Sequence, residues 1–139
     1  MSNVNNFRRF LNTKDITFEE IPYESGGLGF RMLQSLENGP RLILVVSFND
    51  REDIVDLNVY NIAKIDNPLK KEFLHSLLNE LNLSYRFTKF IEEENEISAS
   101  YSFELLGFND YSDYIFQSLI MLYNAVEKEF PKFMKLQWS

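Results

Sequence analysis

One segment of the chain alternates between apolar and polar residues without a break. Every second residue from Ile97 to Leu105 is apolar, and the residues between them are serine or glutamate. Because the side chains of a β-strand point alternately to its two faces, this spacing predicts a half-buried strand over Glu96–Leu105. An acidic turn over Glu92–Asn95 precedes it, so we expect a hairpin in which Ser84–Ile91 is the partner strand.

The first half of the chain predicts four more extended segments. Ile16–Tyr23 and Leu28–Leu36 flank a turn that contains two glycines, which indicates a hairpin. Leu42–Phe48 is apolar on both faces, so we expect a central strand that is covered on both sides. Val55–Ile62 alternates again, which is typical of a strand with one exposed face.

Three amphipathic helices are predicted beside these strands. Apolar residues at spacings of three and four follow Ser2 and Asn3 and predict a short first helix that ends near Asn12. Asn67 and Pro68 form a favourable start for a second helix. Its predicted apolar stripe comprises Phe73, Leu74, Leu77, Leu78 and Leu81.

Asp110 offers a cap for a third helix, which we expect to end at about Phe130 because Pro131 follows. Ile115, Leu119, Leu122 and Val126 form a normal core stripe on this helix. Phe116, Ile120 and Tyr123 add apolar surface beyond that stripe. These three side chains either contact the first helix or are covered by a second copy of the chain.

These elements predict an α+β fold in a single domain over residues 1–139. The expected order is helix, strand meander, helix, hairpin, helix, with the helices packed on one face of a twisted antiparallel sheet. A chain of 139 residues with 45% hydrophobic residues can bury an ordinary apolar core without a disulfide or a structural metal. The sequence contains no cysteine, which excludes thiol catalysis and zinc–cysteine sites.

The net charge of −7 argues against nucleic acid as a partner, because such binding depends on clustered Lys and Arg. The same charge is repelled by anionic membrane surfaces. No apolar run approaches the length of about twenty residues that a membrane span needs, and the polar residues of the N-terminus interrupt any signal-peptide core. We therefore expect a cytoplasmic protein without membrane or nucleic-acid partners.

The chemical groups of the chain predict neither a catalytic, a metal nor a cofactor site. His75 is the only histidine, so one chain cannot assemble a two-histidine metal site. The glutamates of the 92–96 segment lack the spacing of a calcium loop. The glycines at 26, 27 and 29 are followed by a strand rather than by the helix of a phosphate-binding loop. The acidic residues Asp50, Glu52, Asp53 and Asp56 are interpreted as a solvated turn, and a catalytic carboxylate pair is the alternative that the sequence leaves open.

The stretch from Leu57 to Phe103 resembles the YbjN family, which is related to type III secretion chaperones. The resemblance rests on LLNELN at 77–82, followed by YRFTKF at 85–90, an acidic turn and an alternating strand. It implies a type III secretion chaperone-like fold and a role in binding other proteins, commonly as a dimer. It implies no shared active site, so no catalytic residue is carried over.

The predicted function is therefore that of a non-enzymatic protein-binding module, either chaperone-like or a regulatory adaptor, that recognises a polypeptide partner. A homodimer is also expected. The candidate partner-binding residues are Ile54, Tyr60, Ile62, Phe116, Ile120 and Tyr123, with Tyr60 and Ile62 expected to be exposed on their strand. Two alternatives remain open: an immunity or inhibitor protein that masks a basic toxin, and a small-molecule sensor with a concave pocket.

Overall fold

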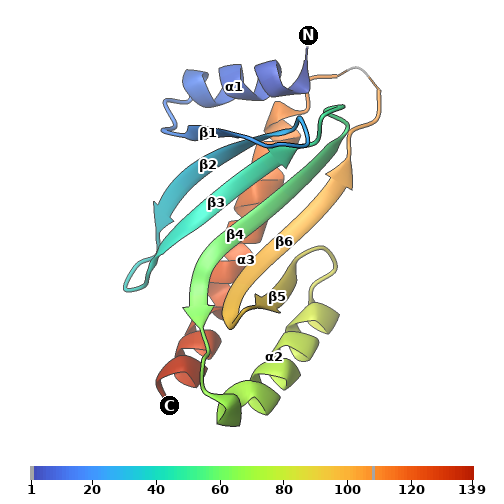
Figure 1. Cartoon of the computed structure of the whole chain (residues 1–139). Coiled ribbons are helices and arrows are strands. Elements are labelled where there is room, and N and C mark those ends of the chain that lie inside the picture. Colours follow the sequence, from blue (N-terminus) through green and yellow to red (C-terminus); the bar gives the residue numbers. More distant parts are fainter. Residues whose placement is uncertain (1, 108) are drawn as a thin grey trace.

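The computed structural model describes residues 2–107 and 109–139 and contains one six-stranded antiparallel sheet with three α-helices (Figure 1). The strands lie side by side in the order β1-β2-β3-β4-β6-β5. The elements are α1 (Asn3–Thr13), β1 (Glu19–Pro22), β2 (Leu28–Ser35), β3 (Arg41–Phe48), β4 (Ile54–Lys64), α2 (Lys71–Ser84), β5 (Lys89–Glu93), β6 (Glu96–Glu104) and α3 (Ser112–Trp138). The α+β architecture and the element order agree with the prediction.

All three helices contribute to one core on the same face of the sheet. The core contains Phe7 of α1, Leu74 of α2 and Leu122 of α3, together with the inward side chains of the strands. The long helix α3 passes behind β3 and β4, and α2 lies beside β5 (Figure 1). We call the opposite face, which no helix of the described residues covers, the outer face.

β3 is central, as predicted, but it is covered by helices on one face only. Leu42, Leu44, Val46 and Phe48 join the core, whereas Val45 points to the outer face. Val45 is nevertheless buried, because it lies between its neighbours on β2 and β4. The prediction that Leu42–Phe48 forms a central strand is confirmed. The prediction that both faces of this strand are covered was wrong.

Three predicted boundaries need correction. β1 begins at Glu19 rather than Ile16, and β5 begins at Lys89 rather than Ser84, because α2 continues to Ser84. The hairpin turn between β5 and β6 is shorter than predicted and consists of Glu94 and Asn95, both with positive φ, as tight hairpin turns require.

A further correction concerns α3, which continues through Pro131 to Trp138. A proline within a helix removes one backbone hydrogen bond and costs about 3 kcal/mol. The residues after Pro131 offset this cost, because Phe133 is fully buried and packs against Phe90 with ring centroids 5.5 Å apart. Burial of a phenylalanine in a packed core contributes an amount of similar size.

The apolar stripe of α2 is narrower than predicted. Leu74, Leu78 and Leu81 are buried, but Phe73 is 68% exposed. A short 3-10 turn, η1 (Pro68–Lys70), precedes α2, and the Asn67 side chain caps this turn by accepting a hydrogen bond from the Leu69 amide.

Candidate functional site

The six predicted partner-binding residues do not form one site. Ile54 and Tyr60 are 41% and 42% exposed on the outer face of β4. They are six positions apart, which corresponds to about 20 Å along a strand. Phe116, Ile120 and Tyr123 belong to α3, on the other side of the sheet. The predicted set therefore divides into two surfaces.

Ile62 was predicted to be exposed, and this prediction was wrong. Val59 lies opposite Ala99 and Ala63 opposite Ile97, so β4 contains two extra residues between these pairs. Tyr60 and Asn61 are both exposed in this β-bulge, and Asn61 has a φ of 71°. The bulge changes the alternation, so Ile62 points into the core with 1% exposure.

The side chains of α3 line a groove beside β2. Its volume is about 580 Å³, and its walls include Phe116, Ile120 and Tyr123 of α3 together with Met32 and Gln34 of β2. Phe116 also contacts Phe10 of α1 with ring centroids 5.5 Å apart. The interpretation that these residues contact α1 is therefore correct for Phe116, whereas Ile120 and Tyr123 face the groove.

The polar groups of this groove are held by local contacts. The Tyr123 hydroxyl donates to the Glu127 carboxylate at 3.4 Å. Burial raises the pKa of Tyr123 and the negative charge of Glu127 adds to this rise, whereas a hydrogen bond with Gln34 opposes it. Tyr123 therefore stays a neutral phenol at physiological pH and presents a ring with a polar tip.

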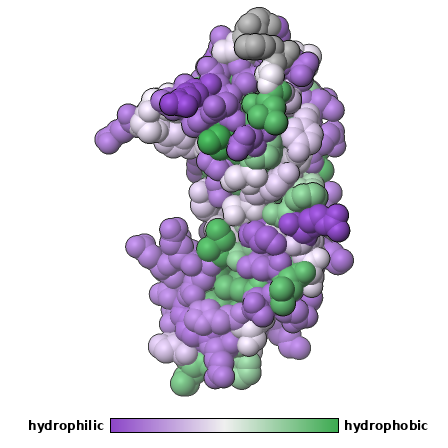
Figure 2. Space-filling view, turned by 90° about the vertical axis from the view of Figure 1, so that its right-hand side faces the viewer, coloured by the Kyte–Doolittle hydropathy of each residue, from purple (hydrophilic) through white to green (hydrophobic). Residues whose placement is uncertain are grey.

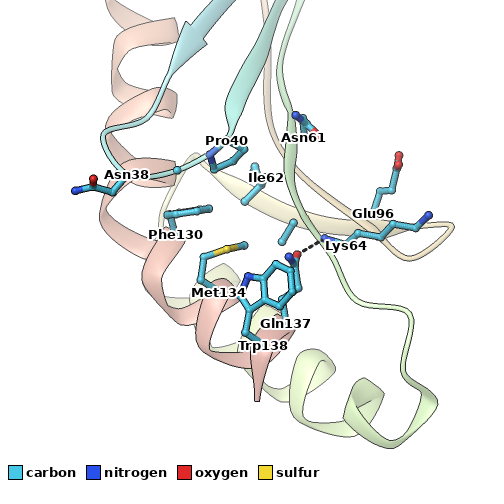
Figure 3. Close-up of a pocket in the computed structure, with 12 residues that line it drawn as sticks. Asn38, Pro40, Asn61, Ile62, Lys64, Glu96, Phe130, Met134, Gln137 and Trp138 are labelled. Carbon is cyan, nitrogen blue, oxygen red and sulfur yellow. Dashed lines mark hydrogen bonds between the residues drawn. The ribbon is translucent and has the colours of Figure 1, made fainter.

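A second cavity, which the sequence did not predict, lies at the C-terminal end of α3 (Figure 3). Its volume is about 430 Å³. Phe130, Met134 and Trp138 follow one face of the helix at intervals of four residues and point toward Ile62 and the β4 bulge. The Gln137 carbonyl oxygen Oε1 accepts a hydrogen bond from the Lys64 amide at 2.8 Å, which ties this end of α3 to β4. The cavity was missed because the helix was expected to end at Phe130.

Two groups of ionisable residues lie near these surfaces. Glu129 is buried and accepts hydrogen bonds from the Tyr85 hydroxyl and, at 3.0 Å, the Lys132 ammonium. Burial alone would raise the pKa of Glu129, but these hydrogen bonds outweigh burial and lower it. Burial, followed by the bond to Glu129, raises the pKa of Tyr85 to about 12. This pair joins α3 to the end of α2.

The second group surrounds Glu92 on β5. Glu92 accepts hydrogen bonds from Lys71 and, at 3.1 Å, from His75, both on α2. His75 lies at a solvated position of α2, since its side chain is 62% exposed, and Glu92 is its carboxylate partner. Within the described residues, no three His, Asp or Glu side chains are grouped as a metal site would require.

The side of the molecule that carries β6, β5 and α2 has a mixed surface. Figure 2 shows hydrophobic residues there in separate patches among hydrophilic ones. The exposed apolar residues of these elements and their connections include Phe73, Leu83, Phe87 and Ile91. The groove beside β2 is lined by three of the six predicted residues, Phe116, Ile120 and Tyr123.

Comparisons with known proteins bear on the fold. No protein-family model and no curated protein matches the chain. A crystal structure of YbjN from E. coli, described as a candidate transcription regulator, is similar with a TM-score of 0.57. The match covers 91% of this chain and 90% of that chain at 12% sequence identity. The chain therefore has a YbjN-like α+β fold, as the resemblance of residues 57–103 implied.

The comparison does not extend to function, because an identity of 12% concerns the fold alone. Among the described residues, no helix is both long and apolar enough to cross a membrane.

Proposed function

We propose that this protein is a non-enzymatic protein-binding module that acts as a regulator or chaperone-like adaptor for a polypeptide partner. The observation that carries this proposal is the groove between α3 and β2. Its concave surface is lined by apolar side chains that are partly exposed. Ile120 is 36% exposed on its wall. Aromatic and aliphatic side chains in such a groove bind a polypeptide with a small loss of side-chain entropy. The description of YbjN as a regulator is consistent with this proposal.

A quantitative capture experiment tests this function. We expect the immobilised protein to retain one partner in stoichiometric amounts, and Ile120→Asp to lose it, because a carboxylate in the groove would be desolvated by the partner. Leu83→Asp is the matched control, since Leu83 is 80% exposed on α2. Equal capture by all three proteins, or by none, would contradict the proposal.

A second candidate function, a small-molecule sensor, is favoured by the cavity in Figure 3. Its volume and mostly apolar walls lie within the range of small-ligand sites. Trp138, which lines it, is the only tryptophan of the chain. We expect the dye 8-anilinonaphthalene-1-sulfonate to bind in this cavity and to quench Trp138 fluorescence by energy transfer. The quenching should saturate as the dye concentration increases. Met134→Glu should abolish the transfer, whereas Met121→Glu on the exposed side of α3 should not.

A further inference from the structure

The C-terminal half of β2 is an open strand edge. β1 pairs only with Leu28–Arg31. At the other end of β2, the Leu36 amide donates to the Pro40 carbonyl. Hydrogen-bonded pairs alternate along an antiparallel ladder, so Gln34 and Met32 bond to β3. The N–H and C=O groups of Leu33 and Ser35 therefore point away from β3, and no strand of the described residues pairs with them.

The apolar groove begins directly beneath this edge. A strand added beside β2 would place the residue opposite Leu33 on the outer face, because opposite residues share a face. Its neighbours, opposite Met32 and Gln34, would point to the helix-covered face, where Phe116, Ile120 and Tyr123 line the groove. Backbone groups and side-chain pocket thus have the geometry that strand addition uses.

A second copy of the chain fits this edge poorly. Only Leu33–Ser35 is free in each copy, since Arg31 is already paired with β1 and Leu36 is buried in the turn. Two such edges would share about 10 Å of strand, whereas a stable dimer buries about 800 Å² on each partner. A single extended segment pairs with the same residues and also fills the groove.

The charges near the groove favour a basic segment. Glu127 accepts a hydrogen bond from Tyr123, which lines the groove, and within residues 2–107 and 109–139 no salt bridge involves Glu127. The chain as a whole has a net charge of −7. Opposite charge on the partner would increase the rate of association and fix its direction along β2.

We propose that an extended segment of a partner polypeptide binds as an added strand on the free edge of β2 at Leu33–Ser35. Its alternate residues are apolar and enter the groove of Phe116, Ile120 and Tyr123, and a Lys or Arg at one end lies beside Glu127. This binding mode rests on the proposed function, because it specifies how the polypeptide partner is recognised.

A phage-displayed library of short random peptides, selected on the whole protein, is the probe. We expect enriched peptides to have apolar residues at every second position and a basic residue at one end. Ser35→Pro should weaken their binding about tenfold or more, because it removes an edge donor. Ser35→Ala keeps this donor and should change binding about twofold or less.

Amide exchange in the wild-type protein is a second measurement that does not depend on the folding of a variant. The amides of Leu33 and Ser35 should exchange rapidly in the free protein and slowly with a selected peptide bound. The Gln34 amide should exchange slowly in both states, since it bonds to β3.

The outcomes separate the two proposals. Enriched peptides that bind Ser35→Pro as well as wild type, or that leave Leu33 and Ser35 amides unprotected, would overturn strand addition and leave the proposed function standing. A selection that enriches no peptide above a bare support would overturn peptide recognition as a whole.

Discussion

The edge strand β5 and the C-terminal half of β2, which β1 does not cover, differ in how their backbone groups are satisfied. At the β5 edge, the Asn82 side chain donates to the Phe90 carbonyl at 3.0 Å and accepts from the Phe90 amide at 2.7 Å. One asparagine of α2 thus occupies the position of a neighbouring strand. At the β2 edge, no strand of the described residues pairs with Leu33 or Ser35, and the Ser35 carbonyl accepts only a hydrogen bond of 3.4 Å from the adjacent Gln34 side chain. Natural sheets close edges that must not pair, so the open edge is the one available to a partner.

The largest effect is expected where the closed edge is fixed to the rest of the core. Phe133→Ala removes the buried ring that packs against Phe90 and should lower the free energy of unfolding by about 3–5 kcal/mol. Phe73→Ala is the control, because Phe73 is largely exposed, and should change it by less than about 1 kcal/mol. Urea denaturation measures both. A loss for Phe133→Ala as small as that expected for Phe73→Ala would mean that the packing of α3 after Pro131 does not contribute to stability.

Asn82→Ala should open the closed edge. It leaves the N–H and C=O of Phe90 without their partner, and we expect a loss of about 2 kcal/mol in the free energy of unfolding. The variant should also self-associate in size-exclusion chromatography, because the new edge can pair. Asn79→Ala, an exposed asparagine of the same helix, should do neither. If the Asn82→Ala variant stays monomeric and keeps the stability of the wild type, then Asn82 does not close the β5 edge.

The closed edge should also weaken in acid. The hydrogen bond from Lys71 lowers the pKa of Glu92, burial partly opposes this, and the bond from His75 adds to the lowering. A lowered pKa in the folded state stabilises the protein above about pH 4.3, the ordinary value for glutamate. This contribution is lost as the pH falls through the lowered pKa of the folded protein.

We expect Glu92→Gln to remove about 1 kcal/mol of stability at neutral pH and to flatten this acid dependence. Glu93→Gln, at the exposed neighbour, should leave the dependence as it is in wild type. Thermal unfolding between neutral and acidic pH measures both variants. If the stability of Glu92→Gln falls in acid as much as that of the wild type, other carboxylates cause the acid dependence of stability.

The smallest effect is expected at the open edge. Ser35→Pro removes an amide that has no strand partner, so the free energy of unfolding should change by less than about 1 kcal/mol. Gln34→Pro is the matched comparison, because it removes a donor to β3 and should destabilise clearly more. If the two proline variants lose similar amounts of free energy of unfolding, then Gln34 and Ser35 do not alternate between bonding to β3 and pointing to the free edge.

The sequence predicted those parts of the fold that depend on periodicity. The alternation of 97–105 and the helical spacing of 4–11 were sufficient, because one buried face decides each element. The hydrogen bonds of Asn82 with Phe90 were not predicted. Its contact with Phe90 depends on where α2 meets β5 in space, and an asparagine side chain gives no local signal of that distance.

The candidate site was predicted only in part. Phe116, Ile120 and Tyr123 follow from the excess apolar surface of α3. Ile62 was misplaced because a β-bulge has no strict sequence signal and inverts the alternation after Asn61. The cavity beyond Pro131 was missed because the local cost of proline was taken to end the helix, while the tertiary contact of Phe133 outweighed it.

Pro131 also divides the backbone hydrogen-bond ladder of α3 into two parts. It cannot supply the amide that would bond to the carbonyl of Glu127, so the cooperative chain of helical hydrogen bonds is interrupted there. The last two turns, which carry Met134 and Trp138, therefore depend on tertiary contacts, namely the burial of Phe133 against Phe90 and the hydrogen bond from the Lys64 amide to Gln137. One wall of the C-terminal cavity is thus held in place by β4 and β5 rather than by its own helix alone.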